Sequence, residues 1–227
     1  MCLILLAWRS MPNQPLVVAA NRDELQARSA DRAAFWHEAP DILAGRDLEA
    51  GGTWMGVSRG HRFAAVTNYR GGRDASAVES RGALVTKFLA GETTPANYVA
   101  ALSHRLSGYS GFNLLVCDRR ELWWVSNRDG GARRLEPGIY GLGNFLLDTP
   151  EVAEPKTRFS RALQSTPALE PLFGVLAGSQ IVSPRYGTRC STILITHDDG
   201  AMTYAERAYD VAGVSGETVR YEVRSRA

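Results

Sequence analysis

Two short apolar runs open the chain, MCLILLAW (residues 1–8) and LVVAANRDE (residues 16–24). The connection between them, residues 9–15, holds two prolines and an asparagine. Apolar runs separated by turn residues of this kind are typical of a β-hairpin with a long loop. The first run is apolar at successive positions, so both faces of the hairpin are expected to be covered by other elements. We therefore build the rest of the fold outward from this hairpin.

The register of the hairpin decides which polar groups meet at its open end. Pairing Trp8 with Leu16 places Cys2 opposite Arg22, to within a residue or two. Asp23 follows directly. The hairpin is therefore predicted to bring a thiol at the chain terminus beside a guanidinium and a carboxylate.

This placement gives Cys2 a specific chemistry if Met1 is removed, which methionine aminopeptidases do when the second residue is small. Cys2 would then carry a thiol and a free α-amine, whose pKa of about 7.7–8.0 suits a general base. One residue could thus supply both the nucleophile and its base. Arg22 is expected to favour the thiolate, and Asp23 to hydrogen-bond or orient the amine.

A structural interpretation remains open for each of these residues. Cys2 can be an ordinary terminal thiol, or a lipidation site beside an apolar run. Arg22, Asp23 and Glu24 can form a solvated turn with a surface ion pair. The nucleophile interpretation is favoured because a reactive thiol needs charged neighbours, and a charged cluster falls opposite Cys2.

The Met-Cys start and the run Asn-Arg-Asp-Glu at residues 21–24 resemble the NRDE family, also called the transport and Golgi organisation family. That family in turn resembles the N-terminal-nucleophile hydrolases, in the branch with bile salt hydrolase and penicillin V acylase. The resemblance covers most of the chain, and we expect residues 1–227 to form a single domain. The spacing between Cys2 and the tetrapeptide makes it more specific than the tetrapeptide alone.

Composition excludes several classes of function. The 227 residues carry a net charge of +2, and the basic residues are scattered, which argues against nucleic acid as the main partner. The three cysteines are odd in number and form no C-x-x-C pair, so neither a disulfide framework nor a metal site is predicted. No apolar run approaches the ~20 residues needed to span a bilayer, and no signal peptide is indicated. A cytoplasmic location is expected.

A second hairpin is predicted from strands at 51–58 and 62–69, joined by a tight turn. Residues 25–48 before it are polar, and we expect an irregular lid or loop. In the hydrolases that the chain resembles, a strand at this point ends in an asparagine of the oxyanion hole, and Asn68 matches it. Losing one such donor typically costs ~10²–10³ in rate. The alternative is an asparagine that ends a strand in a turn.

Periodicity and turn residues predict the remaining elements. Helices are expected at 81–90, 95–108, 156–164 and 169–177, the first capped by Ser80 and the second by Thr94. Strands are expected at 112–117, 121–126, 191–196, 202–207 and 218–224.

Two further site residues come from the resemblance. The run Gly-Leu-Gly-Asn, followed by Leu-Asp-Thr-Pro, is similar to a second signature of the family, and Asn144 matches the second active-site asparagine of the hydrolases. The family usually has a tryptophan soon after that proline, which this chain lacks. Arg189, in a Tyr-Gly-Thr-Arg run just before a predicted strand, matches an active-site arginine. Turn and surface roles are the alternatives, and Arg185 competes with Arg189.

The order of elements predicts an α+β layered domain. The resemblance implies the specific case, an αββα sandwich of two antiparallel sheets between helical layers. It also implies a cysteine N-terminal-nucleophile amidohydrolase that cleaves a non-peptide or small linear amide C–N bond, without metal or organic cofactor. The other hypothesis is a non-catalytic binding or trafficking protein that handles haem, lipid or acyl ligands, with Cys2 as a possible axial ligand of haem.

Overall fold

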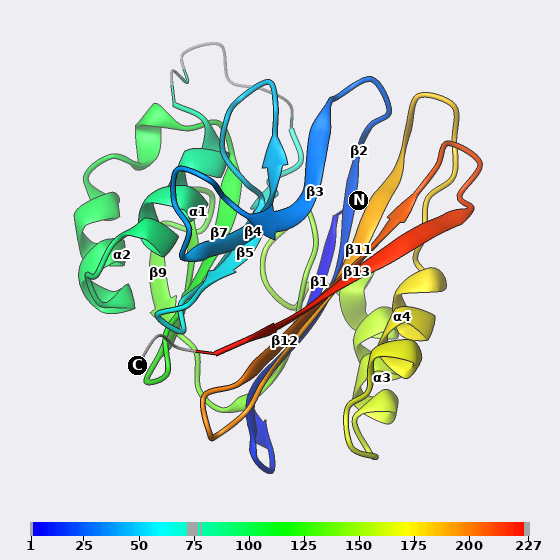
Figure 1. The fold of residues 1–227 in the computed structure, drawn as a ribbon. Helices are drawn as coiled ribbons and strands as arrows, with labels where there is room; N and C mark the ends of the chain where they lie inside the picture. The colour runs from blue at the N-terminus through cyan, green and yellow to red at the C-terminus, as the bar shows by residue number, and fades with distance from the viewer. Residues whose placement is uncertain (1, 72–76, 78, 225–227) are drawn as a thin grey trace. The chain divides into compact units, whose positions relative to one another are not determined.

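The computed structural model describes residues 2–71, 77 and 79–224. Its contacts divide this part of the chain into two compact units. The first unit holds residues 2–28, 137–143 and 147–224, and the second holds residues 29–136 and 144–146. Each unit contains one antiparallel sheet and a pair of α-helices, and Figure 1 shows the elements by label and colour.

The first unit is built on the predicted hairpin. Strands β1 (Leu3–Met11) and β2 (Gln14–Leu25) pair with Trp8 opposite Leu16 and Leu3 opposite Asn21, as the sequence predicts. The strand order is β10-β1-β2-β11-β12-β13. The other strands are β10 (Gly138–Leu142), β11 (Tyr186–Thr196), β12 (Met202–Tyr209) and β13 (Ser215–Val223). The hairpin therefore lies near the middle of the sheet, which explains its continuous apolar runs.

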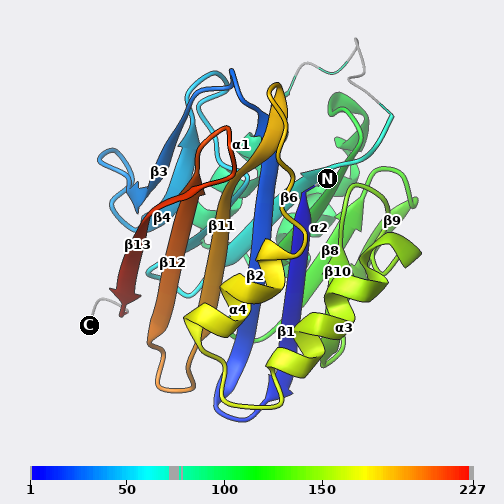
Figure 2. The ribbon, with the colours of Figure 1, turned by 90° about the vertical axis from the view of Figure 1, so that its right-hand side faces the viewer.

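Helices α3 (Ala153–Ala162) and α4 (Leu169–Ala177) lie along one face of this sheet, in front of β1, β2 and β11 in Figure 2. A short 3-10 turn, η2 (Pro150–Val152), precedes α3. The helices contribute Phe159, Leu172, Phe173 and Leu176 to a buried cluster with the sheet residues of that face. Alternate strand residues, such as Leu3, Leu5 and Ala7, supply the sheet side of the cluster, as period-two alternation requires.

The second unit is a meander in which each strand pairs with the next. Its order follows the sequence, from β3 to β9. The strands are β3 (Ala30–Phe35), β4 (Ile42–Asp47), β5 (Met55–Ser58), β6 (Phe63–Asn68), β7 (Phe112–Cys117), β8 (Leu122–Ser126) and β9 (Gly131–Arg134). Sequential strands that neighbour each other are the ordinary arrangement for short connections.

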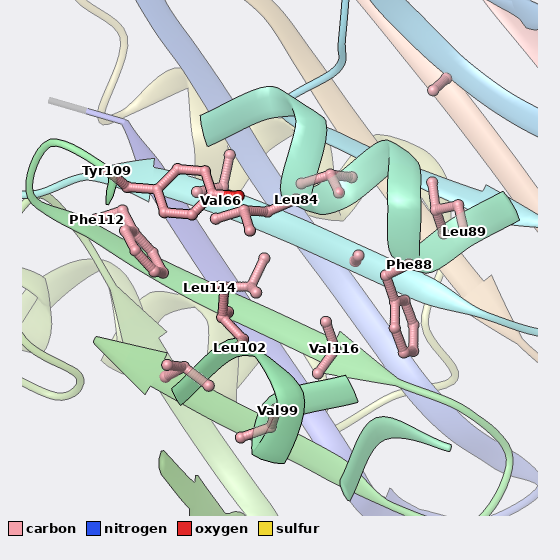
Figure 3. Packing of buried hydrophobic residues seen from close by; sticks show 14 of the residues in the cluster. Val66, Leu84, Phe88, Leu89, Val99, Leu102, Tyr109, Phe112, Leu114 and Val116 are labelled. Carbon is pink, nitrogen blue, oxygen red and sulfur yellow. The ribbon is translucent and has the colours of Figure 1, made fainter. Parts of the chain in front are cut away.

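Helices α1 (Arg81–Ala90) and α2 (Pro95–Ser103) cover one face of the second sheet. Figure 3 shows Leu84 and Phe88 of α1 and Val99 and Leu102 of α2 packed over β6 and β7. Thr94 caps α2 as predicted, accepting a hydrogen bond from the Asn97 N–H at 3.2 Å. Ser80 precedes α1, but its side chain makes no capping hydrogen bond.

Three expectations about elements are wrong. Residues 25–48 contain β3 and β4 rather than an irregular lid. The predicted helix at 95–108 ends at Ser103, and a separate 3-10 turn, η1, spans Leu106–Gly108. Strand β11 begins at Tyr186, five residues before the predicted start at 191, so Arg189 lies within a strand and not before one.

None of the helices in the described ranges has the length and apolar character to cross a bilayer. The expected cytoplasmic location stays a prediction.

Candidate active site

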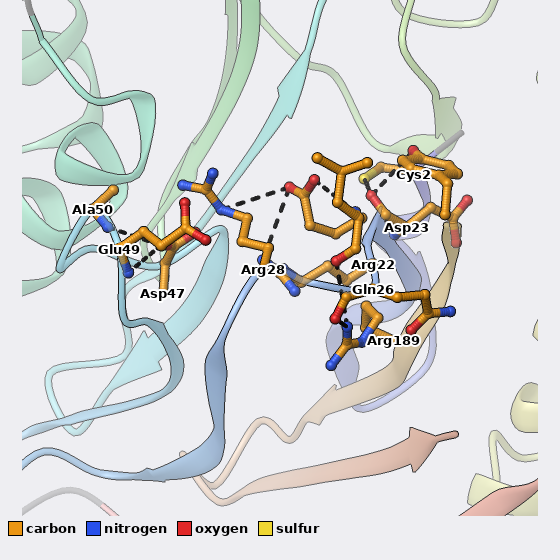
Figure 4. A network of polar contacts seen from close by, with 12 residues as sticks. Cys2, Arg22, Asp23, Gln26, Arg28, Asp47, Glu49, Ala50 and Arg189 are labelled. Carbon is orange, nitrogen blue, oxygen red and sulfur yellow. Dashed lines mark hydrogen bonds and ion pairs between the residues drawn. The ribbon is translucent and has the colours of Figure 1, made fainter. Parts of the chain in front are cut away.

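Cys2 lies at the open end of the first hairpin, where β2 runs further than β1. Strand β1 begins at Leu3, which pairs with Asn21 of β2. Asp23 of β2 therefore lies beyond the last residue pair of these two strands. The Cys2 thiol occupies this place. Its Sγ accepts a hydrogen bond from the Asp23 N–H at 3.4 Å and donates to the Asp23 carbonyl at 3.3 Å. Figure 4 shows the two residues side by side. The Cys2 side chain therefore extends the hydrogen bonding between the two ends of the hairpin beyond the start of β1.

The Asp23 carboxyl group is held from the neighbouring strand. Thr188 of β11 pairs with Asp23 across the sheet, and its hydroxyl donates to Asp23 Oδ1 at 2.6 Å. Both side chains are almost fully buried, at 1% and 3% exposure. Burial raises the pKa of the Asp23 carboxyl, and the hydrogen bond from Thr188 acts against that rise. The carboxyl group is therefore fixed in orientation, and its charge acts on the Cys2 thiol.

The Cys2 thiol is less acidic than the sequence led us to expect. Burial raises its pKa to about 11, and the negative charge of Asp23 adds to the rise. Arg22 lowers the thiol pKa, as expected, but its effect is smaller than either of these. The guanidinium of Arg22 also lies 3.9 Å from the Glu24 carboxylate, which offsets part of its charge. At neutral pH the thiol is protonated and needs a base.

Arg189 lies on the same strand as Thr188, at a β-bulge where the register with β2 shifts. In the described chain, its side chain donates to the carbonyls of Leu25 and Gln26, the latter at 2.5 Å. It therefore fastens the end of β2 rather than contacting the thiol. Arg185 is exposed, and its carbonyl accepts a hydrogen bond from the Gln26 N–H.

The two predicted oxyanion residues meet in the second unit. Asn68 is the last residue of β6, and the Asn144 side chain donates to its carbonyl at 2.7 Å. The Asn144 carbonyl in turn accepts from the Arg70 N–H. Within the described residues, the exposed amide side chain of Asn68 makes no hydrogen bond. Its N–H donors are therefore available to a ligand.

Asn113 fixes the segment that carries Asn144. This asparagine of β7 is fully buried, and its amide donates to the Phe145 carbonyl at 2.7 Å and to Thr67 Oγ1 at 3.2 Å. The ring of Phe145 also meets Tyr69 edge to face. Asn68 and Asn144 are thus joined both directly and by contacts that run through β6 and β7.

Sequence reasoning missed three residues of these networks. Thr188 and Tyr186 belong to a run that resembles the family but receive no predicted role, although their i, i+2 spacing on a strand places both on one face. The Tyr186 hydroxyl donates to the Asp23 carbonyl at 3.1 Å. Asn113 carried no signal, because it lies inside an otherwise apolar strand.

The described residues contain no group of three or more histidine, cysteine or acidic side chains arranged to hold a metal ion.

Solved structures define the class of fold. The chain is similar to an N-acylethanolamine-hydrolyzing acid amidase ortholog from Caenorhabditis elegans, with a TM-score of 0.60 and 13% identity over 86% of this chain and 92% of that one. It is also similar to a mutant of the conjugated bile acid hydrolase from Clostridium perfringens, with a TM-score of 0.58 and 9% identity over 98% and 92%. The expected αββα fold of the N-terminal-nucleophile hydrolases is thereby confirmed.

Sequence comparison then gives the family. Residues 1–184 match the family described as Transport and Golgi organisation 2. A Transport and Golgi organization protein 2 homolog from Bos taurus is 32% identical, over 85% of this chain and 86% of the relative. The homolog from Homo sapiens is 31% identical over the same shares. The chain therefore belongs to the Transport and Golgi organisation 2 family, as its terminal motif led us to expect.

Proposed function

We propose that this protein is a cysteine N-terminal-nucleophile amidohydrolase that cleaves a non-peptide or small linear amide C–N bond. The observation that carries the proposal is the position of the Cys2 thiol, which bonds both backbone groups of Asp23 at the open end of the hairpin. The proposal requires that Met1 is removed, so that Cys2 carries a free α-amine. The names of the two similar structures, an amidase and a conjugated bile acid hydrolase, support amide substrates.

The raised pKa of the Cys2 thiol gives the amine its role. A thiol with a pKa of about 11 is protonated at neutral pH, so attack requires a base that takes its proton. The α-amine of Cys2, with an ordinary pKa of about 7.7–8.0, is partly unprotonated there. It lies on the same residue as the thiol, and Asp23 can hold the resulting ammonium.

The reaction then follows in two halves. The amine takes the thiol proton, the thiolate attacks the amide carbonyl carbon, and the carbonyl oxygen becomes an oxyanion. The ammonium gives its proton to the leaving amine as the C–N bond breaks, which leaves a thioester on Cys2. In the second half the amine removes a proton from water, hydroxide attacks the thioester, and the acid product leaves with restoration of the thiol.

The oxyanion requires donors that are not already committed. Asn68 meets this condition within the described residues, because its amide side chain makes no hydrogen bond. One amide hydrogen of Asn144 is directed to the Asn68 carbonyl, which leaves the other for a ligand. We assign the larger share of oxyanion stabilisation to Asn68. The main role of Asn144 is to position Asn68.

A panel of acyl amides incubated with the processed protein tests the proposal. The expected result is release of amine and acid by the wild type, and loss of that activity in Cys2→Ala. Cys117→Ala is the matched control, because Cys117 is buried in the second unit and its loss is expected to leave turnover intact. A wild-type protein with an unblocked Cys2 amine and no turnover across the panel would contradict it.

A carrier or trafficking role is the second candidate, and the names of the related proteins favour it. Those names describe transport and Golgi organisation rather than an enzyme. A carrier of haem, lipid or acyl ligands needs no base beside Cys2, so it tolerates retained Met1. Binding of such ligands with equal strength by wild type and a Met1-retaining variant, without turnover in either, would favour this role.

A further inference from the structure

Tyr186 reaches the Cys2 site from the neighbouring strand. It is the first residue of β11 and pairs with Leu25, so Asp23 is its diagonal neighbour on β2. The phenol hydroxyl donates to the Asp23 carbonyl at 3.1 Å. The Cys2 thiol donates to the same oxygen at 3.3 Å. One carbonyl oxygen, with two lone pairs, therefore serves both side chains.

The start of β11 is built to hold this arrangement. Ser183 closes a local loop, since its hydroxyl donates to the Tyr186 carbonyl and accepts from the Tyr186 N–H. Two residues further on, Thr188 accepts from the Ile181 N–H at 2.8 Å while it donates to the Asp23 carboxylate. Tyr186 thus fixes the carbonyl of Asp23 and Thr188 fixes its side chain.

Few other charged or titratable groups act on this thiol from the elements beside it. Among the described residues, strand β2 contributes Asp23 and Arg22, and β11 contributes Tyr186 itself. Burial raises the pKa of the Tyr186 phenol, and the negative charges of the Cys2 thiolate and Asp23 raise it further. The phenol therefore stays protonated and remains a hydrogen-bond donor through the range in which an amine-assisted thiol would react.

We propose that Tyr186 is a positioning residue of the Cys2 nucleophile, whose hydroxyl occupies the Asp23 carbonyl and thereby eases loss of the thiol proton. The importance of Tyr186 for catalysis rests on the proposed function. The effect of the Tyr186 hydroxyl on ionisation of the Cys2 thiol does not, because it exists without turnover.

Two electrostatic effects act in the same direction. When the thiol loses its proton, a negative sulfur is left facing a carbonyl oxygen that it no longer bonds. A phenol that donates to this oxygen reduces its negative potential, which stabilises the thiolate. In the protonated state, the phenol shares the oxygen with the S–H and so weakens the bond that favours the thiol. Removing the phenol hydroxyl therefore makes the thiol harder to ionise.

Graded changes in the donor at position 186 test this. The measurement is the rate of Cys2 alkylation by iodoacetamide at pH 8, resolved by peptide mapping. Tyr186→Phe removes the donor with little change in size, and we expect alkylation to slow roughly three- to ten-fold, as half to one pKa unit implies. Replacement of Tyr186 by 3-fluorotyrosine gives a more acidic donor of nearly the same size, and alkylation is expected to be faster than in wild type.

Tyr98→Phe is the matched control, because the Tyr98 hydroxyl also donates to a backbone carbonyl, that of Leu84 at 2.7 Å, in the second unit. Its alkylation rate is expected to equal that of wild type. Equal rates for phenylalanine, tyrosine and 3-fluorotyrosine at position 186 would overturn the inference. A slow phenylalanine variant with unchanged 3-fluorotyrosine protein would also overturn it, since packing rather than donor strength would then control the thiol.

A second measurement needs no substitution at Tyr186. In wild-type protein labelled with carbon-13 at the tyrosine Cζ, one resonance is expected to titrate together with Cys2 and to lose that step in Cys2→Ser. The absence of any tyrosine resonance that titrates together with Cys2 would overturn the inference. Because neither measurement depends on turnover, an inactive protein can still confirm the role of Tyr186. If the protein is an active amidase but shows neither effect, the proposed function stands and the positioning role of Tyr186 is rejected.

Discussion

The two units each carry a polar cluster at the end of a strand, but they hold it by different means. In the first unit, the register of one hairpin sets Cys2 against Asp23, 21 residues apart in the chain. In the second unit, Asn144 reaches Asn68 across 76 residues of sequence. The first arrangement follows from the register of one hairpin, whereas the second depends on a segment that is distant in sequence from the paired strands β6 and β7. The difference indicates that the nucleophile and the oxyanion donors should respond differently to mutation.

The largest effect expected in the second unit is on catalysis and follows from loss of Asn68. The oxyanion carries charge in the transition state and not in the bound substrate, so a donor aimed at it acts mainly on kcat. Asn68→Ala should reduce kcat by ~10²–10³ with little change in KM, and leave Cys2 alkylation unchanged. Steady-state kinetics on any amide substrate that the panel identifies give both parameters.

Asn97→Ala is the control for this measurement, since Asn97 is an exposed asparagine of α2 in the same unit. Unchanged kcat in Asn68→Ala would show that Asn68 only ends its strand. A raised KM with normal kcat would make it a substrate contact.

A smaller effect is expected on the free energy of unfolding, and it differs between the buried asparagine of the first unit and that of the second. Asn21 and Asn113 are both fully buried. Asn21 is satisfied at both ends, donating to the Leu176 carbonyl and accepting from the Ser191 hydroxyl. Asn113 donates to two oxygens, but its own Oδ1 has no hydrogen-bond partner among the described residues.

Alanine at position 21 should therefore cost more stability than alanine at position 113. We expect a loss of about 3 kcal/mol for Asn21→Ala and about 2 kcal/mol for Asn113→Ala in the free energy of unfolding. Urea unfolding of the two variants measures the difference. The reverse order would mean that the Oδ1 of Asn113 has a strong partner, such as an ordered water.

The smallest effect concerns the charge beside the nucleophile. Removing the Arg22 guanidinium takes away a contribution that lowers the Cys2 pKa, so the thiol should become still harder to ionise. Burial and Asp23 have larger effects, and Glu24 offsets part of the arginine charge. Arg22→Ala should therefore slow Cys2 alkylation at pH 8 only about two- to three-fold.

Arg161→Ala, an exposed arginine of α3 in the same unit, makes the same change in net charge and should leave the rate unaltered. A ten-fold loss in Arg22→Ala, or an equal loss in both variants, would be inconsistent with this ranking of causes.

The sequence was informative where apolar periodicity and local pairing decide structure. It predicted the pairing of Trp8 with Leu16, the bounds of α1 and α4, and the cap of α2 by Thr94. It failed for β3, an edge strand whose residues are mostly exposed and so lack an apolar face.

The first residues of β11 were missed for a related reason. They are polar, and Thr188 is nevertheless buried because it bonds a carboxyl group of the neighbouring strand. Neither Thr188 nor Tyr186 could be assigned to Asp23 from the sequence, because a pairing between strands 163 or more residues apart leaves no local pattern. The roles of Asn68, Asn144 and Arg189 came from family resemblance, and they stay predictions.

The central claim is that Cys2 becomes the first residue and forms a covalent bond with an acyl group. Intact-mass and peptide-level mass spectrometry, on protein quenched in acid during reaction with an acyl amide, tests it most directly. The account predicts a chain without Met1 that carries the acyl group as a thioester on Cys2, and no adduct on Cys117 or Cys190. A chain that retains Met1, or a processed chain that hydrolyses the amide with no adduct on Cys2, would contradict it.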